Sequence, residues 1–409
     1  MNERATLLFY CQHSLGMGHL VRSLALAEGL QKRFRIVFLN GGPLPKKIRT
    51  PEGVEVVNLP PLGLDHEGRL VSRDRRRTVE RARESRRRII LETYRQLRPQ
   101  VVFIELFPFG RKKFADELLP MLDEARRAQP SSSLVCCSLR DILVGKKPHQ
   151  QKHDERAVAV ANSYFDAVMV HSDPSFARLE DSLCSHASLR VPVYYTGFVQ
   201  AEQEEESRRP SARARQRQVL VSAGGGLVGE TLFRAAIDAY KILRLDEDAQ
   251  MKIVTGPFLP EDAWLSLRAA AHGQRGLSLK RFVPNLCAEM QNSVASVSQC
   301  GYNTALDILR AGVPALVVPF SEGQEDEQLK RARRLERLGA IRVMEQPHMD
   351  GARLAAEMRE LLDFRPQKLH LDLNGARNTA HIVESLVRSR RSKRAGAANG
   401  IRNAKEAHT

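Results

Sequence analysis

The sequence predicts an α/β protein made of two tandem domains, each built on a parallel β-sheet. The 409 residues exceed the usual size of a single domain, which is about 100–200 residues. Short β-rich runs alternate with helical stretches through both halves of the chain, and this alternation is typical of βαβ units around a parallel sheet.

The N-terminal domain is expected over residues 1–199. Its predicted strands are the β-rich runs at residues 5–11, 35–39, 54–57, 101–105, 134–138, 166–171 and 191–199. Residues 200–217 follow with mixed charge and no hydrophobic pattern, and we interpret them as a linker.

The C-terminal domain is expected over residues 218–375, and ligands usually bind in the cleft between two such domains. Its predicted strands are residues 218–223, 251–256, 278–283, 294–299 and 314–320. A helix over 376–390 is expected to pack back on the N-terminal domain. Residues 391–409 lack apolar periodicity and are expected to form a disordered basic tail.

The composition is that of an ordinary soluble globular protein, with 42% hydrophobic and 27% charged residues. No run of eighteen apolar residues predicts a membrane span, and the N-terminus resembles no secretory signal. The six cysteines include no C-x-x-C pair, so we expect reduced thiols and a cytoplasmic location.

The net charge of +16 is concentrated in two segments. Residues 66–98 hold twelve Arg against five acids (+7), and residues 388–409 hold seven basic residues against one acid (+6). One interpretation is a solvated helix, 73–98, with Arg beside an apolar stripe, plus a loose tail. Another is attraction to an anionic membrane surface, which implies a peripheral protein on the inner membrane face. Nucleic acid is disfavoured because no aromatic residues are interleaved with the arginines.

A glycine-rich turn follows the first predicted strand and contains His13, Gly16, Gly18 and His19. The glycines allow a tight turn, so that helix N–H groups and His19 face the carboxyl edge of the sheet. The turn lacks the third glycine of a dinucleotide fingerprint, and no acid follows the second strand, which disfavours a nicotinamide cofactor. His19 either contacts substrate as a general base or caps and packs its helix.

Two further turns in the C-terminal domain suggest an anion site. Gly224, Gly225 and Gly226 lie between a predicted strand and a helix, and three consecutive glycines indicate a close backbone approach, although a tight turn without a ligand is the alternative. Asn303 and Thr304 are expected at a helix N-terminus, where free N–H groups favour an anion. Asp307 lies one turn further along, within reach of the ribose of a bound nucleoside diphosphate.

Asp246-Glu247-Asp248 has the form of a D-x-D metal-binding motif. The motif follows a helix in a polar turn instead of ending an apolar strand. We therefore expect neither a metal ion nor another cofactor.

The segment 298–328, SQCGYNTALDILRAGVPALVVPFSEGQEDEQ, resembles the donor-nucleotide site of GT-B glycosyltransferases, and of family 28 in particular. This family includes the peptidoglycan lipid-intermediate N-acetylglucosaminyltransferases. The glycine run 224–229 and the HSLGMGH turn occur in the family's order and spacing. The resemblance implies a GT-B architecture, with two Rossmann-like domains whose parallel sheets face across a cleft.

The resemblance also implies roles for individual residues, carried over by position. Asp307 takes the place of a ribose-binding carboxylate that is usually Glu, and Gln328 matches a Gln that contacts the donor sugar. Glu327 departs from the family, in which a second Gln is common at this position. The other matches are the diphosphate cradle (Gly224, Gly225, Gly301, Thr304), the strand end that reads uracil (Phe282, Val283) and the glycine-loop histidine near the acceptor (His19).

The implied activity is transfer of a sugar from a nucleotide-diphosphate donor, with UDP as the expected nucleotide, to an unknown acceptor by inverting displacement. His19 is the preferred base, with Glu105 and Asp141 as second choices, and His13 remains an alternative. Glu105 and Asp141 could equally be structural partners of Arg111 or Arg140. A nucleotide-sugar hydrolase or epimerase on the same scaffold stays open, as does a non-catalytic basic protein that binds anionic lipid or nucleic acid.

Overall fold

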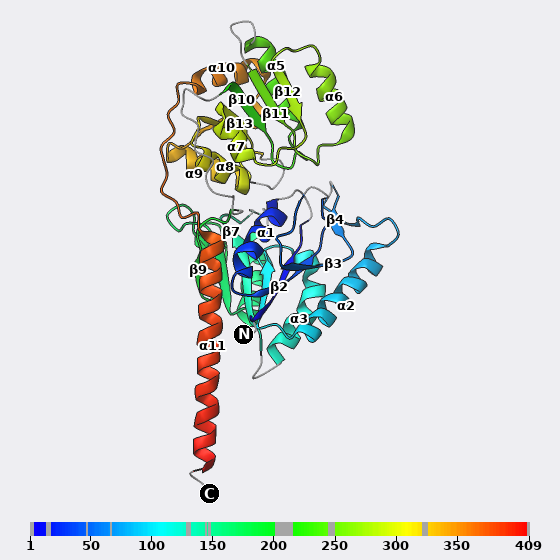
Figure 1. Cartoon of the computed structure of the whole chain (residues 1–409), viewed down its shortest axis with the longest axis vertical. Helices are drawn as coiled ribbons and strands as arrows, with labels where there is room; N and C mark the ends of the chain where they lie inside the picture. The colour runs from blue at the N-terminus through cyan, green and yellow to red at the C-terminus, as the bar shows by residue number, and fades with distance from the viewer. Residues whose placement is uncertain are drawn as a thin grey trace.

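The computed structural model describes residues 4–13, 18–45, 48–65, 68–127, 132–143, 145, 149–200, 216–243, 250–320 and 326–406, with only the backbone for 216–217 and 393–406. Two α/β domains are stacked along the long axis of the molecule, and a long C-terminal helix runs beside the N-terminal domain (Figure 1). The domain boundaries follow from two separate parallel sheets.

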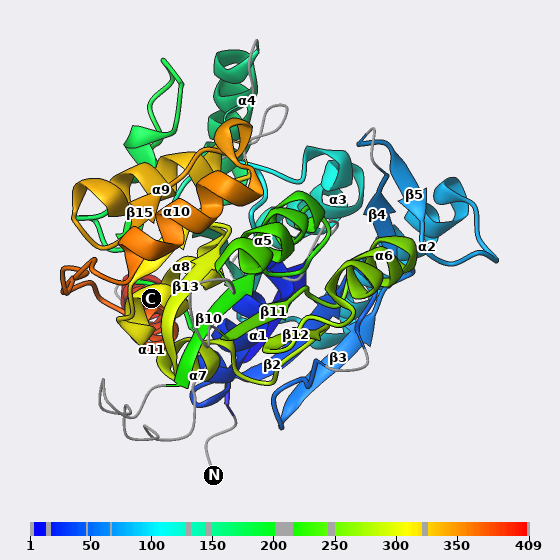
Figure 2. The same cartoon turned by 90° about the horizontal axis from the view of Figure 1, so that it is seen from above.

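The N-terminal domain contains a seven-stranded sheet in the order β3-β2-β1-β6-β7-β8-β9, in which every neighbouring pair is parallel. Its strands are β1 (Thr6–Cys11), β2 (Arg35–Asn40), β3 (Val54–Asn58), β6 (Val101–Glu105), β7 (Leu134–Arg140), β8 (Ala167–His171) and β9 (Val193–Tyr195). A separate antiparallel pair is formed by β4 (Leu62–Leu64) and β5 (Leu70–Ser72), and it lies at the side of the molecule (Figure 2).

Helices cover both faces of this sheet. The helices of the domain are α1 (Gly18–Gln31), α2 (Val79–Leu97), α3 (Ala115–Arg127) and α4 (Gln150–Tyr164), with 3-10 turns η1 (Lys112–Phe114) and η2 (Leu179–Asp181). One face packs against α2, α3 and α4, and the other packs against α1 and the C-terminal helix. Because both faces are covered, β6 and β8 are apolar almost throughout and fully buried.

The C-terminal domain has a six-stranded parallel sheet in the order β12-β11-β10-β13-β14-β15. Its strands are β10 (Gln216–Ser222), β11 (Gln250–Val254), β12 (Leu277–Lys280), β13 (Ser293–Ser298), β14 (Ala315–Val317) and β15 (Arg342–Val343). Its helices are α5 (Glu230–Leu243), α6 (Glu261–Ala271), α7 (Leu286–Gln291), α8 (Tyr302–Ala311), α9 (Glu327–Arg337) and α10 (Gly351–Leu361), with the 3-10 turn η4 (Gln346–His348). One face packs against α5, α6 and α10, and the other against α7, α8 and α9.

The Arg-rich helix α2 begins at the N-cap Thr78, whose hydroxyl accepts a hydrogen bond from the backbone N–H of Arg81. Its buried stripe contains Arg86 beside Ile90 and Tyr94. Arg86 is fully buried and donates to both carboxylate oxygens of Glu117, at 2.6 and 2.7 Å. The expectation that arginines occupy only the remaining faces is therefore wrong at this position, because a buried carboxylate pairs with the guanidinium.

The C-terminal helix α11 (Gly375–Glu406) packs on α1. Its residues Ala376, Ala380, Val383 and Val387 complete the core on that side of the N-terminal sheet. The expectation of a disordered tail is wrong for residues 391–406, because the helix continues to Glu406, and residues 407–409 lie outside the described residues. The stretch is rich in Ala, Arg and Lys, which favour helix without an apolar face.

Most of the expected linker, 201–215, lies outside the described residues, as does Asp246-Glu247-Asp248. The expected strand 191–199 is shorter than predicted, since β9 covers only Val193–Tyr195. Within the part of the chain that the structure describes, no helix is long and apolar enough to cross a bilayer.

Candidate active site between the two domains

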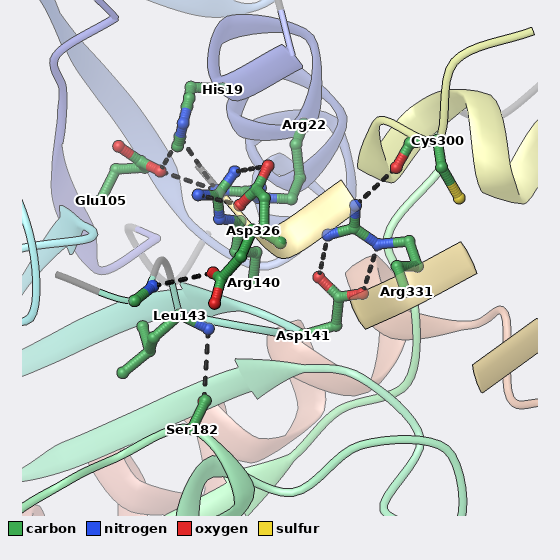
Figure 3. Close-up of polar contacts among 12 residues, drawn as sticks. His19, Arg22, Glu105, Arg140, Asp141, Leu143, Ser182, Cys300, Asp326 and Arg331 are labelled. Atoms are coloured by element: carbon green, nitrogen blue, oxygen red, sulfur yellow. Dashed lines mark hydrogen bonds and ion pairs between the residues drawn. The ribbon is translucent and has the colours of Figure 1, made fainter. Parts of the chain in front are cut away.

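His19 lies in the first turn of α1 and contacts the carboxyl end of β6. Its Nδ1 is 2.6 Å from Oε1 of Glu105 (Figure 3). An ionised carboxylate can only accept, so Nδ1 carries the proton and Nε2 is the unprotonated nitrogen. The imidazole is 15% exposed, whereas Glu105 is fully buried. This geometry positions a neutral imidazole as a proton acceptor.

Two arginines complete the surroundings of Glu105. Arg22, one turn after His19 on α1, donates to Glu105 Oε1 at 2.6 Å, and Arg111 Nε lies 3.8 Å from Oε2. Burial alone would raise the pKa of Glu105, but His19, Arg22 and Arg111 outweigh it and lower the pKa to about 2. Glu105 is therefore a permanent carboxylate that orients His19, and it is not itself free to act as the base.

Burial lowers the pKa of His19, although the Glu105 carboxylate opposes this shift. The imidazole is consequently neutral near pH 7. The competing histidine, His13, is also buried, which lowers its pKa, and its Nε2 lies 3.2 Å from Oδ1 of Asn40. Because the Asn40 amide oxygen accepts, Nε2 carries the proton and Nδ1 is the unprotonated nitrogen of His13. The two histidines differ in their partners, since a carboxylate orients the ring of His19 and a neutral amide contacts the ring of His13.

Asp141, the other second choice, is not positioned as a base. Arg331 of α9 donates to both of its oxygens, at 2.7 and 2.8 Å, and also to the carbonyl of Cys300 at 2.7 Å (Figure 3). The sequence left open that Asp141 is a structural partner of an arginine. Asp141 does have this role, but its hydrogen-bonded partner is Arg331 and not Arg140. Arg140 instead donates to Glu327, at 2.8 Å. These two pairs join the end of β7 to α9 across the domains.

The expected diphosphate cradle lies at the carboxyl ends of β10 and β13. Gly224 has φ +53° and is exposed, and a Cβ added there would lie 3.7 Å from the Thr304 hydroxyl oxygen. Gly301 is the N-cap of α8, and its Cβ position would lie 3.9 Å from the same oxygen. The glycine turn and the N-terminus of α8 thus meet around Thr304, with backbone N–H groups available to an anion.

Backbone packing, and not a ligand, accounts for the glycine at position 226. A Cβ at this position would lie 2.0 Å from the carbonyl oxygen of Thr255, and Gly226 has φ +89°. The close backbone approach is therefore made to the turn after β11. Gly225, between these positions, is half-buried.

The helix that bears His19 touches the helix that begins at the cradle. Asn303 Nδ2, in the first turn of α8, donates to the carbonyl of Gly18 at 3.4 Å. Tyr302 beside it donates to the carbonyl of His171 at 2.9 Å, and its ring lies under the Arg22 guanidinium. The N-termini of α1 and α8 therefore meet across the domain junction.

Asp307 is half-buried on α8, and its carboxyl group makes no hydrogen bond with another residue of the described part of the chain. Burial raises its pKa to about 7, and Arg310 opposes this only in part. Gln328 Oε1 accepts hydrogen bonds from the backbone N–H groups of Cys300 and Phe320, at 2.9 and 3.3 Å. The side chain of Gln328 therefore links the turn before α8 to the segment after β14.

Phe282 and Val283 follow β12 by two residues and are half-buried. Gly16 and residues 321–325 lie outside the described residues. Among the described residues, no group of three or more His, Cys, Asp or Glu could hold a metal ion.

Sequence reasoning missed Arg22 and Arg331 as parts of this site. Arg22 could have been inferred, because it stands three residues after His19 and so shares its helix face. Arg331 gave no local signal, since its partner Asp141 lies 190 residues away in the other domain.

Two parallel-sheet domains joined at a junction of helix N-termini place the chain in the GT-B fold class. Residues 219–384 match the family model described as the glycosyltransferase family 28 C-terminal domain. The resemblance inferred from segment 298–328 is confirmed.

Among curated proteins, the UDP-N-acetylglucosamine–N-acetylmuramyl-(pentapeptide) pyrophosphoryl-undecaprenol N-acetylglucosamine transferase of Pseudomonas savastanoi pv. phaseolicola is 28% identical over 175 residues, covering 43% of this chain and 48% of its own length. The enzyme of the same name from Methylobacterium radiotolerans is 29% identical over 38% of this chain and 41% of its own length. The chain spans about half the length of the curated relatives it matches.

Solved structures extend the similarity to both domains. The calicheamicin glycosyltransferase superposes with a TM-score of 0.58 at 17% identity, covering 98% of either chain. MurG of Acinetobacter baumannii gives 0.57 at 15% identity, with 93% of this chain and 99% of that one covered. At these identities the likeness shows the GT-B fold alone.

Proposed function

We propose that the protein is a glycosyltransferase that moves a sugar from a nucleoside diphosphate donor to a hydroxyl group of an acceptor. The observation that carries the proposal is the contact between Asn303 and Gly18, because it brings His19 next to the N-terminus of α8. A proton acceptor and an anion cradle on opposite sides of one junction are what this reaction requires.

The proposed donor site uses the C-terminal domain. The diphosphate binds at the N–H groups of Gly224 and Gly225 and of the first turn of α8, which replace a metal ion as the charge stabiliser. Asp307 binds the ribose, and the backbone after β12, at Phe282 and Val283, reads the base. Uracil is the proposed base, because the curated relatives are named as UDP-N-acetylglucosamine transferases.

In the proposed reaction, the acceptor oxygen attacks the anomeric carbon while His19 Nε2 takes the hydroxyl proton. The bond from that carbon to the diphosphate oxygen breaks, and its electron pair leaves on the diphosphate. The cradle N–H groups stabilise this new charge, as the donors of an oxyanion hole do. Glu105 holds the imidazole in the tautomer that accepts the proton, and attack from the opposite side inverts the configuration.

The proposed acceptor is lipid-linked. This rests on the names of the curated relatives, which specify a pyrophosphoryl-undecaprenol substrate. It is compatible with the exposed arginines of α2, which would attract an anionic membrane surface. A peripheral location on the inner face of the membrane belongs to the same proposal.

The test is a thermal-shift screen of the purified protein against UDP, GDP, ADP and dTDP and their sugars, because a bound ligand stabilises the native state. We expect a shift with UDP-sugars and its loss in Asp307→Ala. Product analysis with and without polyprenyl-diphosphate sugar acceptors follows. If free sugar is the main product in the presence of acceptor, the activity is hydrolysis, with His19 activating water, and not transfer. If no nucleotide shifts the melting temperature, the proposed donor site is refuted.

A further inference from the structure

A basic cavity lies on the N-terminal domain, away from the domain junction. It has a volume of about 620 Å³ and is bounded by the starts of β6 and β7, the end of α2 and the middle of α11. The carboxyl ends of β6 and β7 carry Glu105 and Arg140. The cavity therefore lies at the opposite edge of the sheet from the candidate active site.

Four arginines line this cavity, two from each of two helices. Arg95 and Arg98 come from the end of α2, and Arg390 and Arg391 come from α11. Glu124 is the acidic side chain among the lining residues and pairs with Arg95. The cavity wall thus carries a clear positive excess, built from segments almost 300 residues apart.

Arg390 is fixed in place, whereas Arg98 and Arg391 are available to a ligand. The Arg390 guanidinium donates to the Ser132 hydroxyl at 2.9 Å and to the Ser133 carbonyl at 3.1 Å, which holds α11 against the loop before β7. Arg98 and Arg391 are exposed, and their guanidinium groups make no hydrogen bond or ion pair with another described residue.

Arg98 also occupies an unfavourable backbone position. It is the C-cap of α2 with φ +43°, where glycine or asparagine is favoured. A long cationic side chain at this position points to a role for the guanidinium itself. Guanidinium groups bind phosphate in a bidentate manner, and the volume exceeds what one inorganic phosphate needs.

We propose that this cavity binds the phosphate of an organic phosphoester, with Arg98 and Arg391 as its ligands and Arg390 as their support. The phosphate belongs either to a soluble metabolite or to a phospholipid headgroup, and both present the same chemistry to the arginines. The site is independent of the proposed sugar transfer.

The test compares Arg98→Asn/Arg391→Gln with Arg275→Asn/Arg268→Gln, in the full-length protein. Arg268 and Arg275 are exposed on the C-terminal domain, outside the cavity and away from α2, so both variants lose two positive charges. Binding is measured with glycerol 1-phosphate by calorimetry, and with vesicles of phosphatidylcholine with and without phosphatidylglycerol by cosedimentation. The thermal shift with the donor nucleotide verifies that each variant is folded.

We expect the cavity variant to lose about tenfold or more in affinity and the control to stay near wild type. Loss confined to glycerol 1-phosphate identifies a soluble ligand, and loss confined to the phosphatidylglycerol vesicles identifies a headgroup. Equal losses of affinity in the two variants would mean that binding depends only on the net charge of the protein, and this result would overturn the proposal. Wild-type protein that binds neither probe would overturn it as well.

Discussion

His19 combines two properties that a general base needs, an oriented ring and a free nitrogen. The Glu105 carboxylate accepts a hydrogen bond from Nδ1–H at 2.6 Å, which leaves Nε2 unprotonated, and the side chain is 15% exposed. Since Arg22 and Arg111 keep Glu105 ionised, the orientation persists over the whole physiological pH range.

Replacing His19 by Ala should lower kcat by about 10²–10⁴-fold and leave donor affinity nearly unchanged, because the ring acts on the acceptor proton. Steady-state kinetics and donor titration test this. His186→Ala removes an exposed imidazole and serves as the control. If His13→Asn lowers kcat as much and His19→Ala does not, the assignment of the base is wrong.

The pH dependence of turnover tests the environment of His19. An imidazole of ordinary pKa, about 6.5, would lose about three quarters of its neutral form at pH 6. Because burial lowers the pKa of His19, we expect kcat to stay level between pH 7.5 and 6. A fourfold loss over this range, with the protein still folded, would contradict the buried geometry.

At the scale of elements, α9 holds the two domains together through one buried ion pair. Arg331 and Asp141 are each almost fully buried, at 2% and 0% side-chain exposure. Replacing Arg331 by Met should destabilise the protein by about 3–5 kcal/mol, since it leaves an unpaired buried carboxylate. Urea unfolding measures the loss, and Arg333→Met, on an exposed position of the same helix, should change stability by less than about 1 kcal/mol.

The core contacts of α11 end at Val387, although the helix continues to Glu406. Removing residues 391–409 should therefore change the thermal midpoint by no more than a few degrees. Removing residues 376–409 should expose the apolar face of α1 and yield an unfolded or aggregated N-terminal domain. Circular dichroism melts of the two truncations distinguish these outcomes, and equal stability would refute the packing of α11 on α1.

The elements were largely predictable because buried parallel strands are continuous apolar runs, as at 101–105 and 134–138. The length of the last helix was not predictable, because α11 continues past its last core residue and only helix propensity favours this extension. In the site, the glycines and Asp307 carried recognisable patterns. The pairing of Asp141 with Arg331 depends on how the domains dock, which no local pattern encodes.

At the scale of the whole molecule, three histidines of the N-terminal domain share one behaviour. Burial lowers the pKa of His13, His19 and His171 in the folded state, so the unfolded chain binds protons that the folded chain does not. The raised pKa of Asp307 acts in the opposite direction, because the folded chain binds a proton there that the unfolded chain does not. Three protons against one leave a net difference of two, so stability should fall as the pH drops below about 6.5, by up to about 3 kcal/mol per pH unit.

Urea unfolding at pH 7, 6 and 5 checks this, and His171→Gln should reduce the slope by about half. His171 contacts the hydroxyls of Ser138 and Thr196, both at 2.8 Å, which Gln can replace in part. A stability that is constant from pH 7 to 5 would show that these imidazoles are not buried as described.

The chain leaves the N-terminal domain after β9 and returns to it as α11, whose Ala376 lies against Gly29 of α1. A Cβ on Gly29 would lie 2.9 Å from the Cβ of Ala376, so the two helices are in intimate contact. During synthesis, the first domain to leave the ribosome cannot finish its own core until residues 376–387, which follow the whole second domain, have been made. The second domain has meanwhile every segment it needs, so maturation of the enzyme runs in the reverse of its domain order.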